Sequence, residues 1–155
     1  EVTGYGATSD GHDMVAPSGE GGERAMRLAL STLPEDRKID YVNAHGTSTP
    51  VGDIKEIVAC RNIWGEGNTP PVGSTKSMTG HSLGATGVQE AIYSMIMMNK
   101  GFIAPSINVT NLDENLAPAE INTELKENAE IDSILSNSFG FGGTNGTVII
   151  SKHRD

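Results

Sequence analysis

The stretch IDYVNAHGTSTP, residues 39–50, runs from an apolar strand through a turn into the start of a helix. Its first six residues are mostly apolar and form a short run, which is typical of a buried strand. Gly46 allows a sharp turn. Thr49 followed by Pro50 pairs an N-cap residue with proline at the first helical position, so a helix is expected to run on to about Trp64.

The rest of the chain repeats this alternation of strand and helix. Ser18 is a candidate N-cap for the first helix, whose apolar residues have helical spacing. Between the last two strands lies a glycine-rich turn. Further strands are predicted at residues 2–8, 71–74, 134–139 and 147–152, and further helices at residues 24–33 and 81–99. The pattern predicts an α/β fold in which a largely parallel sheet ends in an antiparallel pair, as one domain over residues 1–155.

The helix predicted over residues 81–99 has an unusual face. Gly80, Gly84, Gly87 and Ala91 are spaced so that they share one side. Glycine costs about 1 kcal/mol at an interior helix position, so a smooth face is useful only if another backbone packs closely on it. Apolar residues cover most of the remaining circumference, which predicts a buried central helix. Three methionines are expected to fill its core contacts: Met95, Met97 and Met98.

Composition excludes several classes of protein. The chain has 155 residues, of which 36% are hydrophobic and 20% charged, as in a globular domain. Its net charge of −9 argues against binding to nucleic acid or to anionic membrane surfaces. The longest apolar run, residues 91–98, is far shorter than the roughly 20 residues that a membrane helix needs. A single cysteine excludes an internal disulfide, and a reducing, cytoplasmic location is expected.

The beginning of the sequence shows no initiator methionine, no basic segment and no signal peptide. It opens directly on a predicted strand, EVTGYGA. We therefore expect the chain to be a piece of a longer protein.

Two histidines occupy equivalent positions. His45 follows a predicted strand at its carboxyl end, where ligands bind in open α/β sheets, although a lone histidine there is more often structural. His81 lies beyond the next strand, after Lys76, at a predicted helix start. The positive end of the helix dipole disfavours imidazolium, so His81 is expected to be neutral and able to donate an N–H to a developing oxyanion. The repetition makes both histidines candidate catalytic residues.

A third strand end carries the sequence SNSFGFGGTNG, residues 136–146. Glycine-rich turns after strands expose backbone N–H groups, which suits an oxyanion hole. A phosphate cradle is the competing interpretation. It is weaker because a P-loop needs Gly-Lys-Ser/Thr at the start of a helix, whereas a predicted strand follows here.

Carboxylates near the histidines allow two further interpretations. His45, His81, Asp53 and Glu56 could in principle hold a metal, but no characteristic ligand spacing supports this, and neither a metal nor a cofactor is expected. Asp53 is placed to interact with the dipole of its helix. Glu56 is placed to reach inward and pair with Lys76.

Cys60 is not expected to be a nucleophile. It lies about three turns into its helix, far from the N-terminus that would activate a thiolate. A buried, inert thiol is the expected outcome. The chain thus offers two histidines, a lysine and amide donors without a nucleophile, which is the composition of half an active site.

Three motifs in this order resemble the C-terminal half of the 3-oxoacyl-[acyl-carrier-protein] synthases, the condensing enzymes of fatty acid synthesis. They are VNAHGTSTPVGD (42–53), VGSTKSMTGHSLGATG (72–87) and NSFGFGGTNG (137–146). The stretch VTGYGATSDGHDMVAPSGEG (2–21) is more similar to the synthase I subtype than to synthase II. The resemblance covers essentially the whole chain.

The resemblance implies a thiolase-like fold, in which a duplicated α/β unit buries helices between two sheets. It also implies a Cys-His-His site whose cysteine belongs to an N-terminal half that this sequence lacks. By match to the motifs, His45 and His81 are the two catalytic histidines. Lys76 orders the site together with Glu56, and Asp53 supports it.

The same resemblance assigns substrate contacts and partners. Thr47 and Thr49 contact a pantetheine arm, and Phe139 is a further substrate-binding residue. Phe141 gates the acyl pocket, and its N–H contributes to the oxyanion hole. The implied partner is acyl carrier protein, and the full-length enzyme is expected to be a homodimer that binds neither nucleic acid nor membrane. Two alternatives remain: a non-catalytic thiolase-like scaffold subunit, and a phosphate- or nucleotide-binding module.

Overall fold

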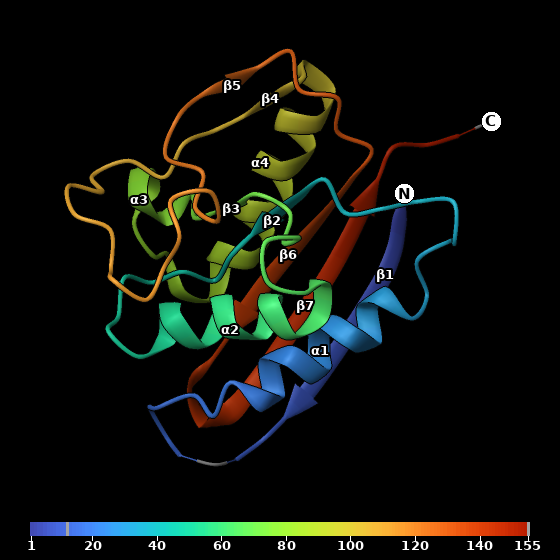
Figure 1. Ribbon diagram of the computed structural model, residues 1–155. Helices are drawn as coiled ribbons and strands as arrows, with labels where there is room; N and C mark the ends of the chain where they lie inside the picture. Colours follow the sequence, from blue (N-terminus) through green and yellow to red (C-terminus); the bar gives the residue numbers. More distant parts are fainter. Residues whose placement is uncertain (12, 155) are drawn as a thin grey trace.

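A computed structural model describes residues 1–11 and 13–154 (Figure 1). The helices are α1 (Glu20–Leu30), α2 (Gly52–Trp64), α3 (Lys76–Thr79) and α4 (Thr86–Lys100), with 3-10 turns η1 (Leu83–Ala85) and η2 (Phe141–Gly143). The strands are β1 (Val2–Ser9), β2 (Tyr41–Asn43), β3 (Val72–Gly73), β4 (Phe102–Ile103), β5 (Lys126–Glu127), β6 (Ser133–Phe139) and β7 (Thr144–Ser151). The short strands β4 and β5 were not predicted from the sequence.

Five strands form one mixed sheet in the order β1-β7-β6-β2-β3. Strand β2 is parallel to β3 and to β6, whereas β7 is antiparallel to both β6 and β1. The predicted mixture of parallel and antiparallel pairing is confirmed, but the prediction of a largely parallel sheet is wrong. Strand β1 joins β7 at the sheet edge, so the antiparallel pairs β1–β7 and β6–β7 equal the parallel pairs β2–β3 and β2–β6 in number. Strands β4 and β5 pair separately.

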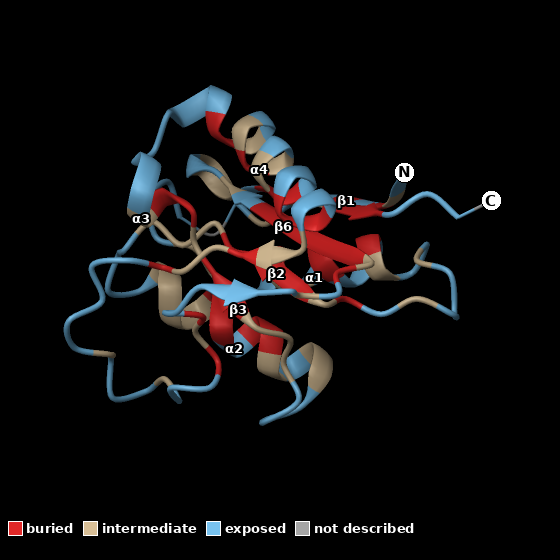
Figure 2. Ribbon diagram, turned by 90° about the horizontal axis from the view of Figure 1, so that it is seen from above, coloured by how far each residue is buried: buried red, intermediate tan, exposed pale blue. Residues whose placement is uncertain are grey.

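The sheet lies between two layers of helix (Figures 1 and 2). Helices α1 and α2 cover one face, and α4 covers the other. Alternation along the strands divides the core accordingly. Leu135 and Ile149 belong to the cluster beneath α1 and α2, whereas Ile134 and Ile150 belong to the cluster beneath α4. The carboxyl ends of β2 and β3 therefore lie together at one end of a sheet that is covered by helices on both faces.

Helix α1 packs unusually closely on β1. A Cβ atom built on Gly6 would lie 2.0 Å from the carbonyl oxygen of Ala25. Only glycine at this position lets the helix backbone approach the strand so closely.

The two predicted helix starts on this side of the sheet are approximately right. Helix α1 begins at Glu20 with Gly19 as its N-cap, one residue beyond the predicted Ser18, and Ser18 Oγ accepts the Glu20 N–H at 3.1 Å. Helix α2 begins at Gly52, just beyond Pro50, and the Gly52 N–H donates to Thr49 Oγ1 at 3.2 Å.

The prediction for residues 81–99 is partly wrong. Helix α4 starts at Thr86, and left-handed backbone at Gly80 (φ 73°) and Leu83 (φ 52°) breaks the helix before it. Gly80 and Gly84 therefore do not share a helix face with Gly87, and a Cβ on either would meet nothing within 4 Å. Only at Gly87 is space tight, 3.1 Å from Ser138 Oγ.

Helix α4 is also not buried all round within this chain. Its sheet-facing side is buried and includes Glu90, Ser94, Met97 and Met98. The opposite side is exposed because the sheet covers only one face of the helix. The exposed apolar side chains there are Val88, Ile92, Met95 and Ile96. Met97 and Met98 thus fill the core as expected, and Met95 does not.

Across residues 1–11 and 13–154, no helix combines the length and the apolar character that crossing a membrane requires.

The α1–β1 contact generates a stability prediction. Gly6→Ala should lower the free energy of unfolding of the protein that carries this chain by about 1–3 kcal/mol, because the new methyl group overlaps the Ala25 carbonyl oxygen. Urea unfolding followed by circular dichroism measures this change. The matched control is Gly146→Ala on β7, where the nearest atom to the new Cβ is 3.8 Å away. Equal stability of the two variants would contradict the close packing.

Candidate active site

The two predicted histidines lie side by side. The ring centroids of His45 and His81 are 5.4 Å apart in a T-shaped arrangement. His45 directly follows Ala44 at the carboxyl end of β2, and His81 lies between α3 and η1. The ring of Phe139, at the end of β6, is 5.8 Å from that of His45. Two sheet strands and the α3–η1 connection thus meet at one cluster of rings.

The backbone at His45 is held by the carboxylate of Glu56. The N–H of His45 donates to Glu56 Oε1 at 2.9 Å, and the N–H of Gly46 donates to Oε2 at 3.0 Å. Gly46 adopts a positive φ of 35°, and a Cβ there would lie 2.8 Å from Ser74 Cβ. Ser74 Oγ also donates to the Gly46 carbonyl oxygen at 2.7 Å. The turn after β2 is therefore fixed on both sides.

Glu56 takes its third hydrogen bond from Asn137 Nδ2, at 2.9 Å. The side chain of Glu56 is only 5% exposed. Burial raises the pKa of Glu56, and the N–H donors of Gly46, Asn137 and His45 offset only part of that rise. The predicted pair between Glu56 and Lys76 is wrong, because the carboxylate is directed to N–H groups of the turn and of β6.

Lys76 instead forms a buried ion pair with Glu90 of α4. The residues are 8% and 1% exposed, respectively. Burial raises the pKa of Glu90, and the hydrogen bond from Lys76 lowers it. Sequence reasoning missed Glu90. The available signal was a polar stripe on an otherwise apolar helix, because Thr86, Glu90 and Ser94 are spaced four residues apart.

His81 is anchored through its side chain. Its Nδ1 forms a 2.9 Å hydrogen bond with Oγ1 of Thr86, the first residue of α4. The histidine itself precedes η1 and does not stand at the start of α4, so the expected placement in the helix dipole is not observed. With Nδ1 engaged, Nε2 is the ring nitrogen that can bond a ligand.

His45 is a neutral imidazole at physiological pH. Burial lowers its pKa from 6.5 to about 4, and the charges of Lys76 and His81 contribute in the same direction. A neutral ring keeps one N–H to donate and one nitrogen to accept. The pair can therefore offer two hydrogen bonds to one oxygen atom bound between the rings.

A cavity of about 430 Å³, which we call the histidine cavity, opens beside His45. It is bordered by the loop over residues 13–19 and by η2. The predicted substrate-contacting residues all line it: Thr47, Thr49, Phe139 and Phe141. Phe141 is 78% exposed and stands at its edge. His81 and Lys76 lie outside this lining.

The glycine-rich turn at this cavity is tied down by its own backbone. Gly140 donates its N–H to the Thr144 carbonyl oxygen at 2.6 Å, and Gly142 donates to the Met14 carbonyl oxygen at 3.0 Å. These bonds occupy two of the N–H groups that a phosphate cradle would use. The phosphate interpretation therefore loses support.

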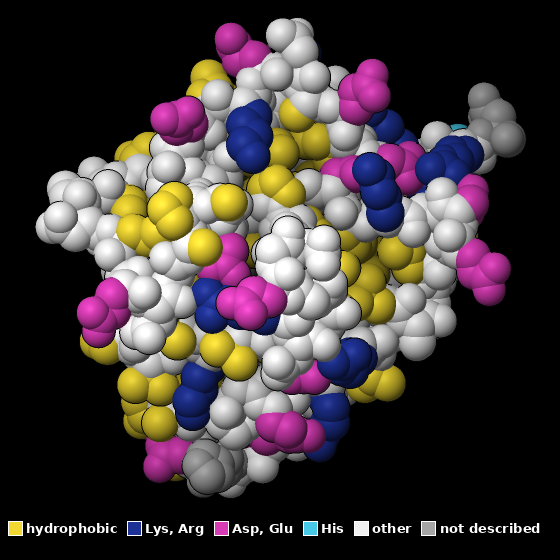
Figure 3. Space-filling view, viewed as in Figure 1, with side chains coloured by type: hydrophobic (Ala, Val, Ile, Leu, Met, Phe, Trp, Pro, Cys, Tyr) yellow, Lys and Arg dark blue, Asp and Glu magenta, His cyan; other side chains and the backbone are white. Residues whose placement is uncertain are grey.

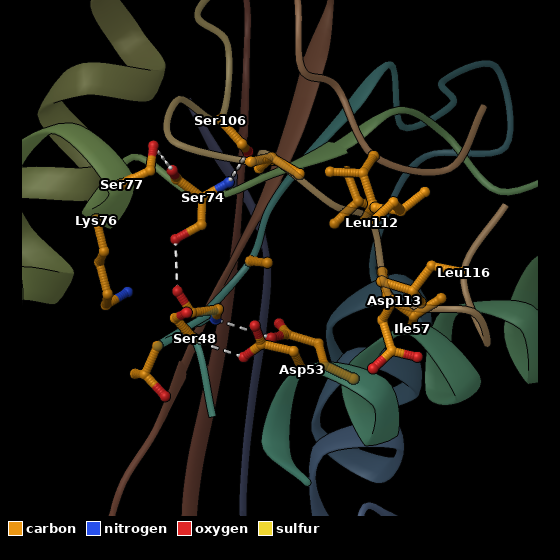
Figure 4. Close-up of a pocket in the computed structure, with 18 of the residues that line it drawn as sticks. Ser48, Asp53, Ile57, Ser74, Lys76, Ser77, Ser106, Leu112, Asp113 and Leu116 are labelled. Carbon is orange, nitrogen blue, oxygen red and sulfur yellow. Dashed lines mark hydrogen bonds between the residues drawn. The ribbon is translucent and has the colours of Figure 1, made fainter. Parts of the chain in front are cut away.

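A second cavity, of about 640 Å³, lies on the other side of residues 46–49 (Figure 4). Lys76 and Ser74 stand on one side of it, and Leu112 and Leu116 stand on the other. Asp53 borders both cavities and accepts the N–H of Ser48 at 3.1 Å, so its role is to hold the turn. Burial raises the pKa of Asp53, and the backbone N–H groups of Thr49, Ser48 and Thr47 offset part of this rise.

In the part of the chain that the structure describes, no group of three histidine, cysteine, aspartate or glutamate side chains could hold a metal ion. Asp53 and Glu56 both accept hydrogen bonds from backbone N–H groups, which weakens the suggestion that they act as metal ligands.

Cys60 is fully buried, and burial raises the pKa of its thiol. It is the inert thiol that its position predicts.

Known proteins provide an independent comparison. Residues 1–110 match the family described as Beta-ketoacyl synthase, C-terminal domain. A 3-oxoacyl-[acyl-carrier-protein] synthase 1 of Haemophilus influenzae is 59% identical over 153 residues, covering 99% of this chain and 37% of that protein. The chain thus spans little more than a third of the length of the curated relative.

Solved structures agree on the fold. A beta-ketoacyl synthase from Burkholderia phymatum matches at 39% identity and a TM-score of 0.89, covering 99% of this chain and 37% of its own. A type II polyketide synthase acyl-carrier protein in complex with its ketosynthase matches at 26% identity and a TM-score of 0.88, over 98% of this chain and 38% of the matched chain. The predicted thiolase-like α/β fold is confirmed.

The buried, neutral state of His45 predicts a pH dependence of stability. Between pH 6.5 and about 4, the unfolded chain binds a proton at His45 that the native state does not bind, so stability is lost as the pH falls. From pH 8 to pH 5 this loss should be about 2 kcal/mol. Urea unfolding at both pH values measures it, and His45→Gln should lose correspondingly less. Equal losses in both proteins would contradict the prediction.

Proposed function

The chain belongs to the beta-ketoacyl synthase family, and from this premise we propose that it is the C-terminal part of a condensing enzyme of fatty acid synthesis. It supplies the two histidines of a Cys-His-His site, and the remainder of the enzyme supplies the nucleophilic cysteine. The single observation that carries this proposal is the pairing of a neutral His45 with His81, 5.4 Å apart, at the carboxyl end of the central strand.

The reaction is a decarboxylative Claisen condensation. An acyl chain is held as a thioester on the cysteine, and a malonyl thioester on the carrier enters the site. His45 and His81 donate hydrogen bonds to the malonyl thioester oxygen, which stabilises the enolate formed when the C–C bond to the carboxylate breaks and CO₂ leaves. The enolate carbon attacks the acyl carbonyl carbon, the C–S bond breaks, and the thiolate leaves. The new chain is two carbons longer.

Other residues position these groups. The Lys76–Glu90 pair links the segment before His81 to the sheet-facing side of α4, which supports the assigned ordering role of Lys76. Thr47 and Thr49 line the histidine cavity, as a pantetheine arm threaded past His45 requires. Phe141, exposed at the cavity edge, is suited to gate the acyl pocket.

The proposed partner is an acyl carrier protein. Support comes from the matched ketosynthase structure that contains its acyl-carrier protein. The carrier is acidic and needs a basic docking patch, whereas this chain has a net charge of −9. On the face seen in Figure 3, lysine and arginine side chains are interspersed with aspartate and glutamate. We therefore place the main docking patch in the remainder of the enzyme, and we propose that the full-length enzyme is a homodimer.

The 155-residue chain alone should not elongate acyl groups, because it has no activated cysteine. Purified chain is incubated with acyl- and malonyl-carrier protein, and 3-oxoacyl product is measured by mass spectrometry. The expected amount equals that of the reaction without enzyme. Product above this background would overturn the division of the site between two parts.

In the full-length enzyme, His81→Ala should abolish malonyl decarboxylation, because one of the two donors to the enolate oxygen is removed. Loss of a donor of this kind costs roughly 100- to 1,000-fold in rate. The assay is CO₂ release from malonyl-carrier protein. His153→Ala, which alters a histidine whose side chain is 70% exposed, is the control and should decarboxylate normally. Unchanged decarboxylation by His81→Ala would refute the role of His81.

A further inference from the structure

A chain of buried hydrogen bonds runs from β7 to the backbone of His45. Thr147 Oγ1 donates to Asn137 Oδ1 at 2.8 Å, Asn137 Nδ2 donates to Glu56 Oε1 at 2.9 Å, and the same oxygen accepts the His45 N–H at 2.9 Å. Thr147 and Asn137 are 2% and 0% exposed. They are cross-strand partners in the β6–β7 register, so their side chains lie next to each other on one face of the sheet.

The chemistry of the three side chains fixes the direction of every bond. A carboxylate can only accept, so the NH₂ group of Asn137 must face Glu56. Its second N–H points to Met26 Sδ at 3.3 Å, and its carbonyl oxygen then needs the Thr147 hydroxyl as donor. If the amide of Asn137 turned over, its oxygen would face the Glu56 oxygen and the two would repel. The amide is thus held in this orientation from both ends, by the Glu56 carboxylate at its NH₂ group and by the Thr147 hydroxyl at its oxygen.

We infer that Thr147 and Asn137 are positioning residues that act on His45 through Glu56. Through Glu56 they hold the two successive N–H groups of His45 and Gly46, and these two residues form the backbone that aims the His45 ring. A small rotation of the carboxylate would tilt both peptide groups and move the ring relative to His81. This inference rests on the proposed role of His45 in malonyl decarboxylation.

The test uses the full-length enzyme with Thr147→Val, which keeps the shape of the side chain and removes its hydroxyl. The kcat of malonyl decarboxylation should fall by about 10- to 100-fold, the range expected when a reacting group is misplaced by up to an ångström. The KM for malonyl-carrier protein should stay unchanged, because Thr147 lies outside the histidine cavity. Acyl transfer to the cysteine should also proceed at the wild-type rate.

Two variants separate positioning from general loss of structure. Thr147→Ser keeps a hydroxyl and should restore most of the wild-type kcat. Ser151→Ala removes another buried, hydrogen-bonded hydroxyl from the same strand, far from Glu56, and should leave kcat unchanged. The inference is overturned if Thr147→Val decarboxylates like wild type, if Thr147→Ser is no better than the valine variant, or if Ser151→Ala loses as much.

A second measurement does not depend on activity. Amide hydrogen exchange of the peptide over residues 43–47, followed by mass spectrometry, should speed up in Thr147→Val and return to the wild-type rate in Thr147→Ser. Unchanged exchange in the valine variant would overturn the inference. If the wild-type enzyme itself released no CO₂, the proposed function would fail, while the exchange experiment would still decide whether the hydrogen-bond chain holds His45.

Discussion

The carboxylate of Glu56 is the constraint on which the site depends. It is a buried acid that accepts N–H groups from the turn after β2 and from β6, and so joins helix α2 to two strands of the sheet. Burying a carboxylate is unfavourable unless donors compensate it, so the three bonds must be made together. Because His45 and Gly46 supply two of them, the position of the first histidine follows from the folding of α2 onto the sheet.

A second buried acid plays the corresponding part on the other face. Glu90 meets Lys76 beneath α4, and Thr86 of the same helix bonds His81. Each histidine is thus tied to a different layer of helix, one through its backbone and one through its side chain. The 5.4 Å separation between the rings depends on how these two layers are held apart by the sheet.

Much of this could be predicted from the sequence. The strand-to-turn pattern at residues 39–50 correctly placed His45 at a strand end, and the repeated layout singled out His81, whose ring lies 5.4 Å from that of His45. The partners of the charged residues could not be predicted. Glu56 lies closer to His45 than to Lys76 along the chain, yet nothing local reveals that its carboxylate turns toward backbone N–H groups. The exposure of Val88 was not predicted. Apolar periodicity shows which side chains are favoured in a core, but it does not show whether a second layer of this chain covers them.

The sheet also joins the two extremes of the chain. Val2 pairs with Ile150, and Glu1 exchanges backbone hydrogen bonds with Ser151. During synthesis on the ribosome, β1, on which α1 packs, therefore has no β7 to pair with until β7 has been translated, on the order of ten seconds later. Over that interval an unpaired strand edge is exposed, which is the condition under which nascent chains aggregate. Pairing of β1 with β7 is thus a late step in the synthesis of this chain, and the hydrogen bonds that join Thr147, Asn137 and Glu56 cannot form before β7 is made.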